Sequence, residues 1–356
     1  MLKCLKQNSE IEFKIFVTGM HMLEKYGYTY IEIEREFKNH LMFFKNQQED
    51  SSHSMDLVLS QTITGFNEQV FSYNPDLIVV HGDRVEALAG AVVGSLNNIL
   101  TAHIEGGEVS GTIDDLIRHS ISKLCHLHLV SNRSAKNRLI QLGESNKSIH
   151  MIGSPEIDVM LSDDLPSLEN SLQHYDIPWD NFALFCYHPV TTELEKIKSN
   201  IENIYSALIE SKINYVIIEP NNDSGTEHIY QKIILLKRNE NIRSFPSISH
   251  RHYLTLLKNC NFIIGNSSSG VREAPIYAKP SINIGTRQKD RNKHETIINC
   301  SENKKDILNA IYHANLMKSK EPSYSFGKKG VSQRFIKLIE KEDIWKTSLQ
   351  KKFVDL

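Results

Sequence analysis

The chain has 356 residues, which is too long for one typical hydrophobic core and suits two domains of about 150 to 180 residues each. Hydrophobic residues make up 40%, charged residues 24%, and the formal net charge is −2, so composition favours neither a disordered acidic tail nor a surface that coats nucleic acid. The five cysteines form no CxxC pair, which favours a reducing cytoplasm. The sequence has no run of about 18 apolar residues, so we expect no membrane span. We expect the partner to be a small molecule.

Short β-branched runs alternate with amphipathic stretches of ten or more residues from residue 11 onward. This pattern is typical of βαβ units and parallel sheets. The predicted strands are residues 13–19, 76–82, 99–107, 126–131 and 148–153, then 181–188, 214–220, 262–268 and 280–285.

A polar stretch over residues 161–180, with two prolines, separates the two series of strands. We therefore expect an N-terminal Rossmann-like domain over 1–162 and a second over 163–330. Residues 331–356 have a helical pattern and are expected to pack back across the two lobes. Glycine-containing or polar loops follow strand after strand, and in open parallel sheets such loops converge on a ligand crevice, here predicted between the lobes.

The first chemistry-bearing stretch is HGDR, residues 81–84, where a predicted strand gives way to a helix. Asp83 and Arg84 would place a carboxylate and a guanidinium at the crevice. The alternative is that Asp83 or its neighbouring amides only cap the helix.

The stretch HIEGGEVSGTIDDLIRH, residues 103–119, is denser in acidic and basic groups. Asp114 precedes Arg118 by four residues, so the two share a helix face. Carboxylates gathered at one strand end suggest acid and base groups with different pKa values. A metal site built from His103, Glu105 and Glu108 is the alternative, although no HxxxH or HExxH spacing occurs.

Two further histidines, His126 and His128, alternate with apolar residues on a predicted strand and are interpreted as structural.

GNSSSGVREAP, residues 265–275, follows an apolar run and leads into a helix. Successive amide groups and hydroxyls at such a helix start can bind a diphosphate. Glu273 could then accept hydrogen bonds from a ribose diol. The alternative is a serine-rich helix start capped by Asn266 or Ser267, and neither GxGxxG nor a Walker loop is present.

Six motifs together resemble the hydrolysing UDP-N-acetylglucosamine 2-epimerases of sialic acid biosynthesis, over about residues 2–356. They occur in the family's order: HGDRVEAL, HIEGGEVSGTIDDLIRH, HPVTTE, PNNDSGTE, GNSSSGVREAP and GTRQ. The resemblance implies a GT-B-type α/β fold of two Rossmann-like doubly wound parallel-sheet domains, with the nucleotide held mostly by the second. It implies conversion of UDP-N-acetylglucosamine and water to N-acetylmannosamine and UDP, no nicotinamide cofactor, no required metal, and a homo-oligomer.

The resemblance also assigns residues. Asp83, Glu105 and Asp114 match the family's acid/base positions, and Arg118 and His188 match further active-site positions, with His188 near the phosphates. The substrate-binding matches are Arg84, Ser267, Ser268, Glu273 and Arg287 for UDP, and His21 on the sugar side. Which carboxylate removes a proton and which returns one stays open.

The chain departs from the family at its start, because family members begin with a strand and a GTRAD or GSRAD loop before the helix that residues 2–22 resemble. We expect that a central strand and a UDP-binding arginine are missing, and that an upstream extension would restore function.

Four alternative functions stay open: a hydrolysing epimerase of a UDP-2,4-diacetamido-trideoxy sugar, a non-hydrolysing epimerase, a GT-B glycosyltransferase, and an inactive UDP-sugar-binding protein. HIEGGE, with Glu105, favours the sialic acid branch.

Overall fold

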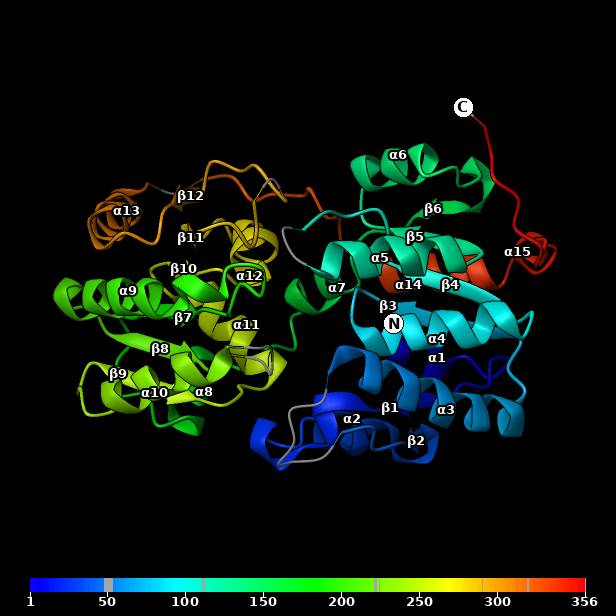
Figure 1. Ribbon diagram of the computed structural model, residues 1–356, viewed down its shortest axis with the longest axis horizontal. Coiled ribbons are helices and arrows are strands. Elements are labelled where there is room, and N and C mark those ends of the chain that lie inside the picture. The colour runs from blue at the N-terminus through cyan, green and yellow to red at the C-terminus, as the bar shows by residue number, and fades with distance from the viewer. Residues whose placement is uncertain are drawn as a thin grey trace. The chain divides into compact units, whose positions relative to one another are not determined.

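The computed structural model describes residues 1–47, 54–110, 113–220, 223, 225–289, 291–318 and 320–355. The chain divides into two compact units, each with its own parallel sheets (Figure 1). Unit 1 comprises Met1–Val109, Ile113–Leu161 and Ser325–Leu356, and unit 2 comprises Ser162–Tyr324 together with Ser110.

Unit 1 alternates strands and helices along the chain. Its main elements are α1 (Leu2–Gln7), β1 (Ile15–Val17), α2 (Tyr30–Phe37), β2 (Leu41–Phe43), α3 (Met55–Tyr73), β3 (Leu77–His81), α4 (Val85–Leu96), β4 (Leu100–Ile104), α5 (Ile113–Leu124), β5 (Leu127–Val130), α6 (Arg133–Gln141), β6 (Ile149–Met151), α7 (Glu156–Met160), α14 (Val331–Ile339) and α15 (Glu342–Trp345). Strands β3, β4, β5 and β6 form a parallel sheet in that order, and β1 pairs with β2 in a separate parallel sheet.

The helices α3, α4 and α5 pack against β3 through one apolar cluster. Val58 of α3, Val80 of β3 and Ile121 of α5 belong to it. Every residue of β4 and β5 is buried, as expected for strands in the middle of a parallel sheet with both faces covered. The ends of β3 and β4 are therefore held rigidly beside each other.

Unit 2 contains one larger sheet. Its main elements are α8 (Leu168–His174), β7 (Ala183–Cys186), α9 (Ile197–Ser211), β8 (Tyr215–Ile218), α10 (Thr226–Leu236), β9 (Ile242–Phe245), α11 (His250–Asn259), β10 (Ile263–Gly265), α12 (Ser268–Arg272), β11 (Ser281–Ile284), β12 (Ile297–Cys300) and α13 (Lys304–Leu316). The strands are all parallel, in the order β12-β11-β10-β7-β8-β9.

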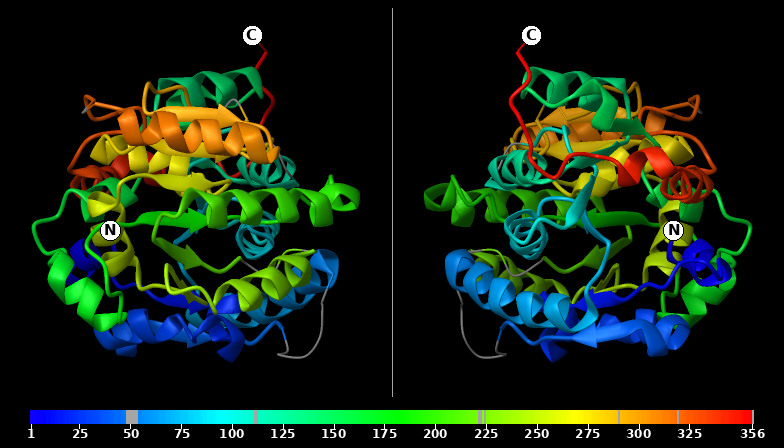
Figure 2. Two further views of the ribbon diagram at one scale, coloured as in Figure 1. Left: turned by 90° about the vertical axis from the view of Figure 1, so that its left-hand side faces the viewer. Right: turned by 90° about the vertical axis from the view of Figure 1, so that its right-hand side faces the viewer.

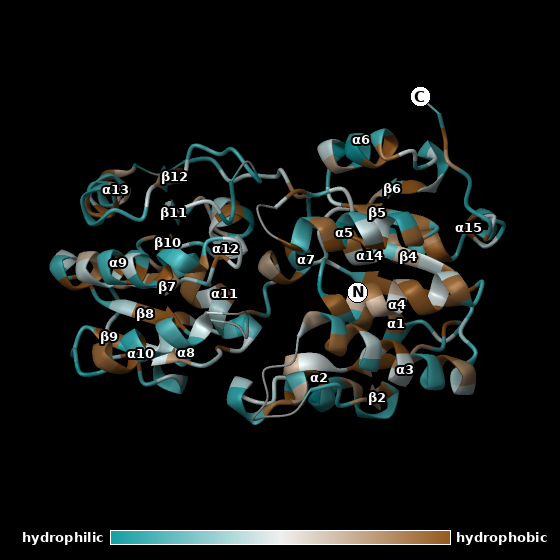
Figure 3. Ribbon diagram, viewed as in Figure 1, coloured by the Kyte–Doolittle hydropathy of each residue, from teal (hydrophilic) through white to brown (hydrophobic). Residues whose placement is uncertain are grey.

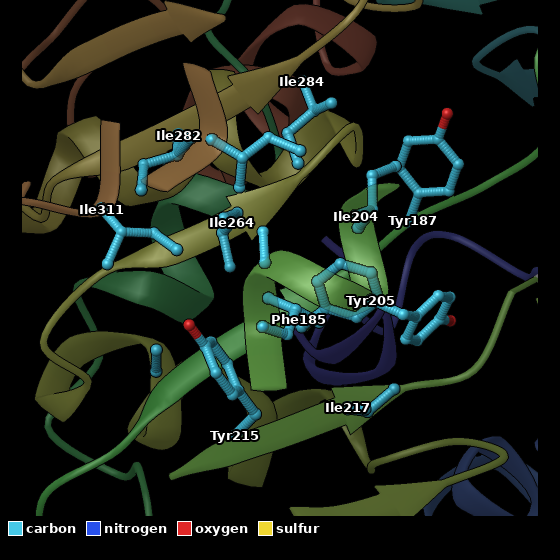
Figure 4. Packing of buried hydrophobic residues seen from close by; sticks show 14 of the residues in the cluster. Phe185, Tyr187, Ile204, Tyr205, Tyr215, Ile217, Ile264, Ile282, Ile284 and Ile311 are labelled. Atoms are coloured by element: carbon cyan, nitrogen blue, oxygen red, sulfur yellow. The ribbon is translucent and has the colours of Figure 1, made fainter. Parts of the chain in front are cut away.

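Helices cover both faces of this sheet. One face packs against α9, α10 and α13, and Figure 4 shows Phe185, Tyr205 and Ile264 within that cluster. The rings of Phe185 and Tyr205 meet edge to face at 5.6 Å. The other face packs against α8 and α11. Burying each such large side chain stabilises the fold by about 1.5 to 3 kcal/mol. Figure 3 shows that the covering helices carry both apolar and polar residues.

Gly265 ends β10 beside the backbone of β7. Its φ is +137°, and a Cβ there would lie 1.9 Å from the carbonyl oxygen of Cys186. Only glycine fits, because any side chain would collide with the backbone of β7. This close approach brings the loop after β10 against the loop after β7.

The predicted α/β fold with parallel sheets in two domains is confirmed. All nine predicted strands are present, and three short ones, β2, β9 and β12, were missed. In the C-terminal segment, α14 and α15 are helical, but the described residues 347–355 are not, which corrects the prediction of a helical pattern over 331–356. The N–H of Val354 donates to the carbonyl of Gly143 at 3.2 Å, and Figure 2 shows this tail running beside α6.

The helices in the described part of the chain include none that is both long and apolar enough to cross a membrane.

Candidate functional site

Asp83 lies in the turn that joins β3 to α4. Gly82 makes this turn with a φ of +78°, a left-handed conformation that glycine adopts without strain. The helix N-cap is Arg84, and its side chain makes no capping bond. Asp83 instead accepts a hydrogen bond from the Nη2 of Arg118, so the structure favours an ion pair over the capping alternative.

Arg118 is a buried guanidinium on α5, with 2% of its side chain exposed. Besides Asp83, it contacts Asp115 at 3.5 Å and donates to the carbonyl of Glu108 at 3.4 Å. A buried charge needs such partners because it has lost its hydration. Arg118 thus connects α5 to the end of β3 and to the loop after β4.

His103 of β4 also contacts this turn. Its Nε2 lies 2.8 Å from the carbonyl of Gly82, and its Nδ1 lies 3.0 Å from Ser122 Oγ. Burial lowers the pKa of His103 to about 3, so the ring is neutral. Because a carbonyl can only accept, Nε2 carries the proton and Nδ1 accepts from the serine.

Glu105 follows β4 directly and is 5% exposed. Its φ of +65° is left-handed, which is costly for a residue with a Cβ and is typical of functional sites. Ser154 Oγ donates to Oε1 at 2.5 Å, and His81 Nε2 lies 3.2 Å from Oε2. The nearby Glu108 is also buried, and it accepts a hydrogen bond from Ser131 Oγ at 2.7 Å.

Asp114 and His21 complete the predicted residues of unit 1. Asp114 is half-buried in the first turn of α5, where the helix dipole favours a carboxylate. His21 lies in the short helix Gly19–Met22 after β1, and its Nδ1 is 2.7 Å from Thr29 Oγ1. Partial desolvation lowers the pKa of His21, and Glu86 and Arg84 at the start of α4 act on it electrostatically. The structure thus brings His21 near the Asp83 turn.

The two histidines interpreted as structural are both buried in unit 1. His126 Nδ1 accepts from the N–H of Thr101 at 3.1 Å, and His126 Nε2 lies 3.0 Å from the carbonyl of Leu349. His128 Nε2 lies 2.9 Å from Glu144 Oε2. Both rings bond to groups of the scaffold, which confirms the structural interpretation.

In unit 2, His188 is held by Asn266 through two reciprocal bonds. The N–H of His188 donates to Asn266 Oδ1 at 2.7 Å, and Asn266 Nδ2 donates to the carbonyl of His188 at 2.8 Å. Asn266 is fully buried. It therefore ties the loop after β7 to the loop after β10, as the close approach at Gly265 allows.

The remaining predicted residues of unit 2 lie around the same loop. Ser267 is the N-cap of α12, and Ser268 is its first residue. Arg287 Nη1 donates to the carbonyl of Asn266 at 3.3 Å. Glu273 is 9% exposed, and its Oε2 has no hydrogen-bond partner among the described residues, so this oxygen can accept a bond from a ligand hydroxyl.

Several groups that position the predicted residues were missed in the sequence. No role was predicted for Ser154 or His81, which hold Glu105. His103, which holds the Asp83 turn, was considered only as a metal ligand, and Asn266 was noted only as a possible cap. In the sheet, His81 pairs with Ile104, the residue before Glu105. Aligning the ends of the two predicted strands would therefore have indicated that His81 lies beside Glu105. Among the described residues, no three His, Cys, Asp or Glu side chains form a group that could hold a metal ion.

The chain has two α/β units, each built on parallel strands, and buried acidic and basic side chains lie at the strand ends. These features place it in the class of two-domain α/β enzymes. The chain belongs to the UDP-N-acetylglucosamine 2-epimerase family, whose model matches residues 3–340.

Known proteins of this family are similar over most of the chain. It is 44% identical to the UDP-N-acetylglucosamine 2-epimerase of Neisseria meningitidis over 100% of this chain and 94% of that protein. It is 31% identical to the hydrolysing UDP-N,N'-diacetylbacillosamine 2-epimerase of Legionella pneumophila, over 96% and 91%. The structure of the Methanocaldococcus jannaschii UDP-GlcNAc 2-epimerase with UDP-GlcNAc and UDP matches with a TM-score of 0.73 at 18% identity, over 91% and 98%, and shows the shared fold.

Proposed function

We propose that this chain is a hydrolysing UDP-N-acetylglucosamine 2-epimerase of sialic acid biosynthesis, which converts UDP-N-acetylglucosamine and water to N-acetylmannosamine and UDP. The observation that carries the proposal is the placement, at the ends of the adjacent strands β3 and β4, of the Asp83–Arg118 pair and the buried carboxylate of Glu105. The 44% identity to the Neisseria meningitidis protein named UDP-N-acetylglucosamine 2-epimerase supports the substrate.

The reaction needs two kinds of group. A base removes the proton at sugar C2 while the C1–O bond to UDP breaks, which leaves a glycal. Water then adds at C1 as a proton returns to C2 on the opposite face. Carboxylates in different surroundings suit this exchange, because one must be ionised and another protonated. Glu105, Asp114 and Asp83 are the candidates, and Arg118 pairs with Asp83.

Unit 2 is proposed to bind the UDP part. Amide groups and hydroxyls of Ser267 and Ser268, with Arg287, would stabilise the leaving diphosphate. The family resemblance adds Arg84 of unit 1 as a further UDP-binding match. The unbonded oxygen of Glu273 would accept from the ribose, and His188 would lie near the phosphates. The UDP and UDP-GlcNAc bound to the Methanocaldococcus jannaschii protein support a UDP-sugar ligand.

The second candidate is hydrolysis and epimerisation of a UDP-2,4-diacetamido-trideoxy sugar, favoured by the 31% identity to the Legionella pneumophila enzyme. Purified protein is incubated separately with each UDP-sugar and the products are followed by NMR. Release of N-acetylmannosamine and UDP from UDP-N-acetylglucosamine supports the main proposal. Turnover of the diacetamido sugar alone supports the second candidate, and binding without turnover of either overturns both.

A variant tests the acid/base role directly. Asp114→Asn is expected to lower turnover by about 10² to 10⁴ with folding intact. Asp164→Asn, at an exposed position, is the control. Near-normal turnover of Asp114→Asn would remove Asp114 from the mechanism.

A further inference from the structure

The carboxylate of Glu105 is held by one side chain on each oxygen. Ser154 Oγ donates to Oε1 at 2.5 Å, and His81 Nε2 lies 3.2 Å from Oε2. His81 ends β3, and sheet register places it opposite Ile104, the residue before Glu105. The N–H of Gly82 also bonds to the carbonyl of Ile104 at 3.1 Å. The paired backbones of β3 and the buried strand β4 therefore hold His81 beside Glu105.

The two partners of Glu105 differ in their access to water. Ser154 is 2% exposed and Glu105 has 7% of its side chain exposed, whereas His81 has 45% exposed. A hydroxyl can orient a carboxylate but does not store a proton near neutral pH. An imidazole both accepts and donates a proton in that range. His81 is thus suited to exchange protons between the buried carboxylate and solvent.

An acid/base carboxylate has to exchange one proton in every turnover. If Glu105 removes the C2 proton, it ends the reaction protonated; if it supplies the proton, it ends the reaction ionised. In both cases it must return to its starting state before the next substrate. Burial of Glu105 limits direct exchange with water, so a second group has to complete the cycle.

We infer that His81 relays protons between Glu105 and water, an inference that rests on the proposed function. When Glu105 is protonated, its O–H bond breaks and the proton forms an N–H bond at Nε2 of the neutral ring. The imidazolium then releases its Nδ1 proton to water, and the ring regains its starting tautomer by exchange with solvent. When Glu105 must instead be reprotonated, the same bonds form and break in reverse order, and water supplies the proton.

Other titratable groups lie near this pair. His103 and Arg118 act electrostatically in the same cluster, and Asp83 follows His81 by two residues and is paired with Arg118. His103 is neutral and engaged through both ring nitrogens. Neither His103 nor the Asp83–Arg118 pair combines partial exposure with an imidazole that contacts Glu105.

The test compares two replacements of His81. His81→Gln places an amide nitrogen near the position of Nε2, so it can hold Glu105 Oε2 but cannot relay a proton, and His81→Ala leaves space for an added imidazole. Both are expected to lower kcat for UDP-N-acetylglucosamine by about tenfold to hundredfold. Imidazole added to His81→Ala should restore turnover in proportion to its concentration. Ser154→Ala should also be slower but should gain nothing from imidazole, and His313→Asn, at an exposed position on α13, should match the wild type.

The outcomes separate the relay from simple positioning. Wild-type turnover in His81→Gln would overturn the relay, because holding Glu105 would then suffice. A slow His81→Ala that imidazole or 4-methylimidazole does not restore would overturn it as well. Circular dichroism and urea unfolding establish that each variant is folded. If the wild-type protein itself converts no UDP-sugar, the proposed function fails, and the relay is then rejected with it rather than by the variants.

Discussion

Arg118 on α5 reaches the end of β3, where its guanidinium pairs with the carboxylate of Asp83. The arginine side chain is 2% exposed and the aspartate side chain 23% exposed, so the pair is largely shielded from water. Removing one partner of such a pair leaves an uncompensated charge, which costs far more than the net stability that the intact pair contributes.

Arg118→Met is therefore expected to lower the free energy of unfolding by about 3 to 5 kcal/mol. Adding Asp83→Asn to Arg118→Met removes the carboxylate that has lost its arginine. The double variant should therefore recover part of the lost free energy of unfolding. Urea unfolding of the wild type, both single variants and the double variant gives the coupling free energy. Additive effects of the two substitutions would contradict a direct pair. Turnover should be lost in all three variants.

A second prediction concerns the pH dependence of stability. Burial lowers the pKa of His103 from its ordinary value near 6.5 to about 3 in the folded protein. Between these two values the unfolded chain binds the proton and the folded chain does not. The stability that His103 contributes is thus fully present above pH 6.5 and is lost as pH falls below it, by about 1.4 kcal/mol per pH unit.

His103→Gln can still donate to the carbonyl of Gly82 but does not titrate. Urea unfolding at pH 7 and pH 5 should therefore show a smaller loss of stability in His103→Gln than in the wild type. Several other histidines of unit 1 titrate as well. The test therefore compares how steeply the free energy of unfolding changes with pH in the variant and in the wild type. His313→Gln, on the exposed side of α13, serves as the control. Equal slopes in His103→Gln and wild type would reject the assignment.

The sequence predicted the strand pattern well because buried parallel strands form continuous β-branched runs. The three missed strands lack that signal: β2 has three residues, β9 mixes Arg243 and Ser244 with its apolar residues, and β12 lies at the edge of its sheet with no fully buried residue. Edge strands need fewer apolar residues, since one side of the strand has no neighbour.

The candidate site was only partly predictable for a different reason. Asp83, Glu105 and Arg118 stand in dense local motifs, so their residue types indicate chemistry. The groups that position them come from elsewhere in the chain: Ser154 lies 49 residues after Glu105, and Asn266 lies 78 residues after His188. Such contacts depend on which strands are neighbours, and strand order does not follow from hydrophobic periodicity.

Asn266 gives a third prediction, in unit 2. Its two reciprocal bonds to His188 fix the loop after β7. Asn266→Ala leaves a buried N–H and a buried carbonyl without these partners, which is expected to lower stability by about 1 to 3 kcal/mol. The loop carrying His188 should also lose its fixed position, so the affinity for UDP should fall.

Isothermal titration with UDP measures that change in affinity. Asn261→Ala, at an exposed position before β10, is the matched control for loss of an asparagine side chain. Unchanged UDP affinity in a destabilised Asn266→Ala would restrict Asn266 to folding and would separate His188 from the UDP site.

The C-terminal tail provides the last prediction, through Lys351, which is one of the residues that hold it. Lys351 Nζ pairs with Glu144 at 2.7 Å and donates to the carbonyls of Lys123 and Cys125, at 2.9 and 2.6 Å, where α5 ends. Unpaired carbonyls and the negative end of the helix dipole both favour a cation there. Burial alone would raise the pKa of Glu144, but hydrogen bonds from His128, Lys123 and Lys351 outweigh it and lower the pKa to about 2.

Lys351→Met is expected to release the tail from α5 while leaving the β3 and β4 strand ends in place. Limited proteolysis should then cleave within the last ten residues much faster than in the wild type, and the melting temperature should fall by a few degrees. Lys352→Met changes an exposed neighbour and should leave both unchanged. Equal proteolysis of the two variants would show that the tail is held by its apolar contacts, such as Phe353 against Gly143, rather than by the lysine.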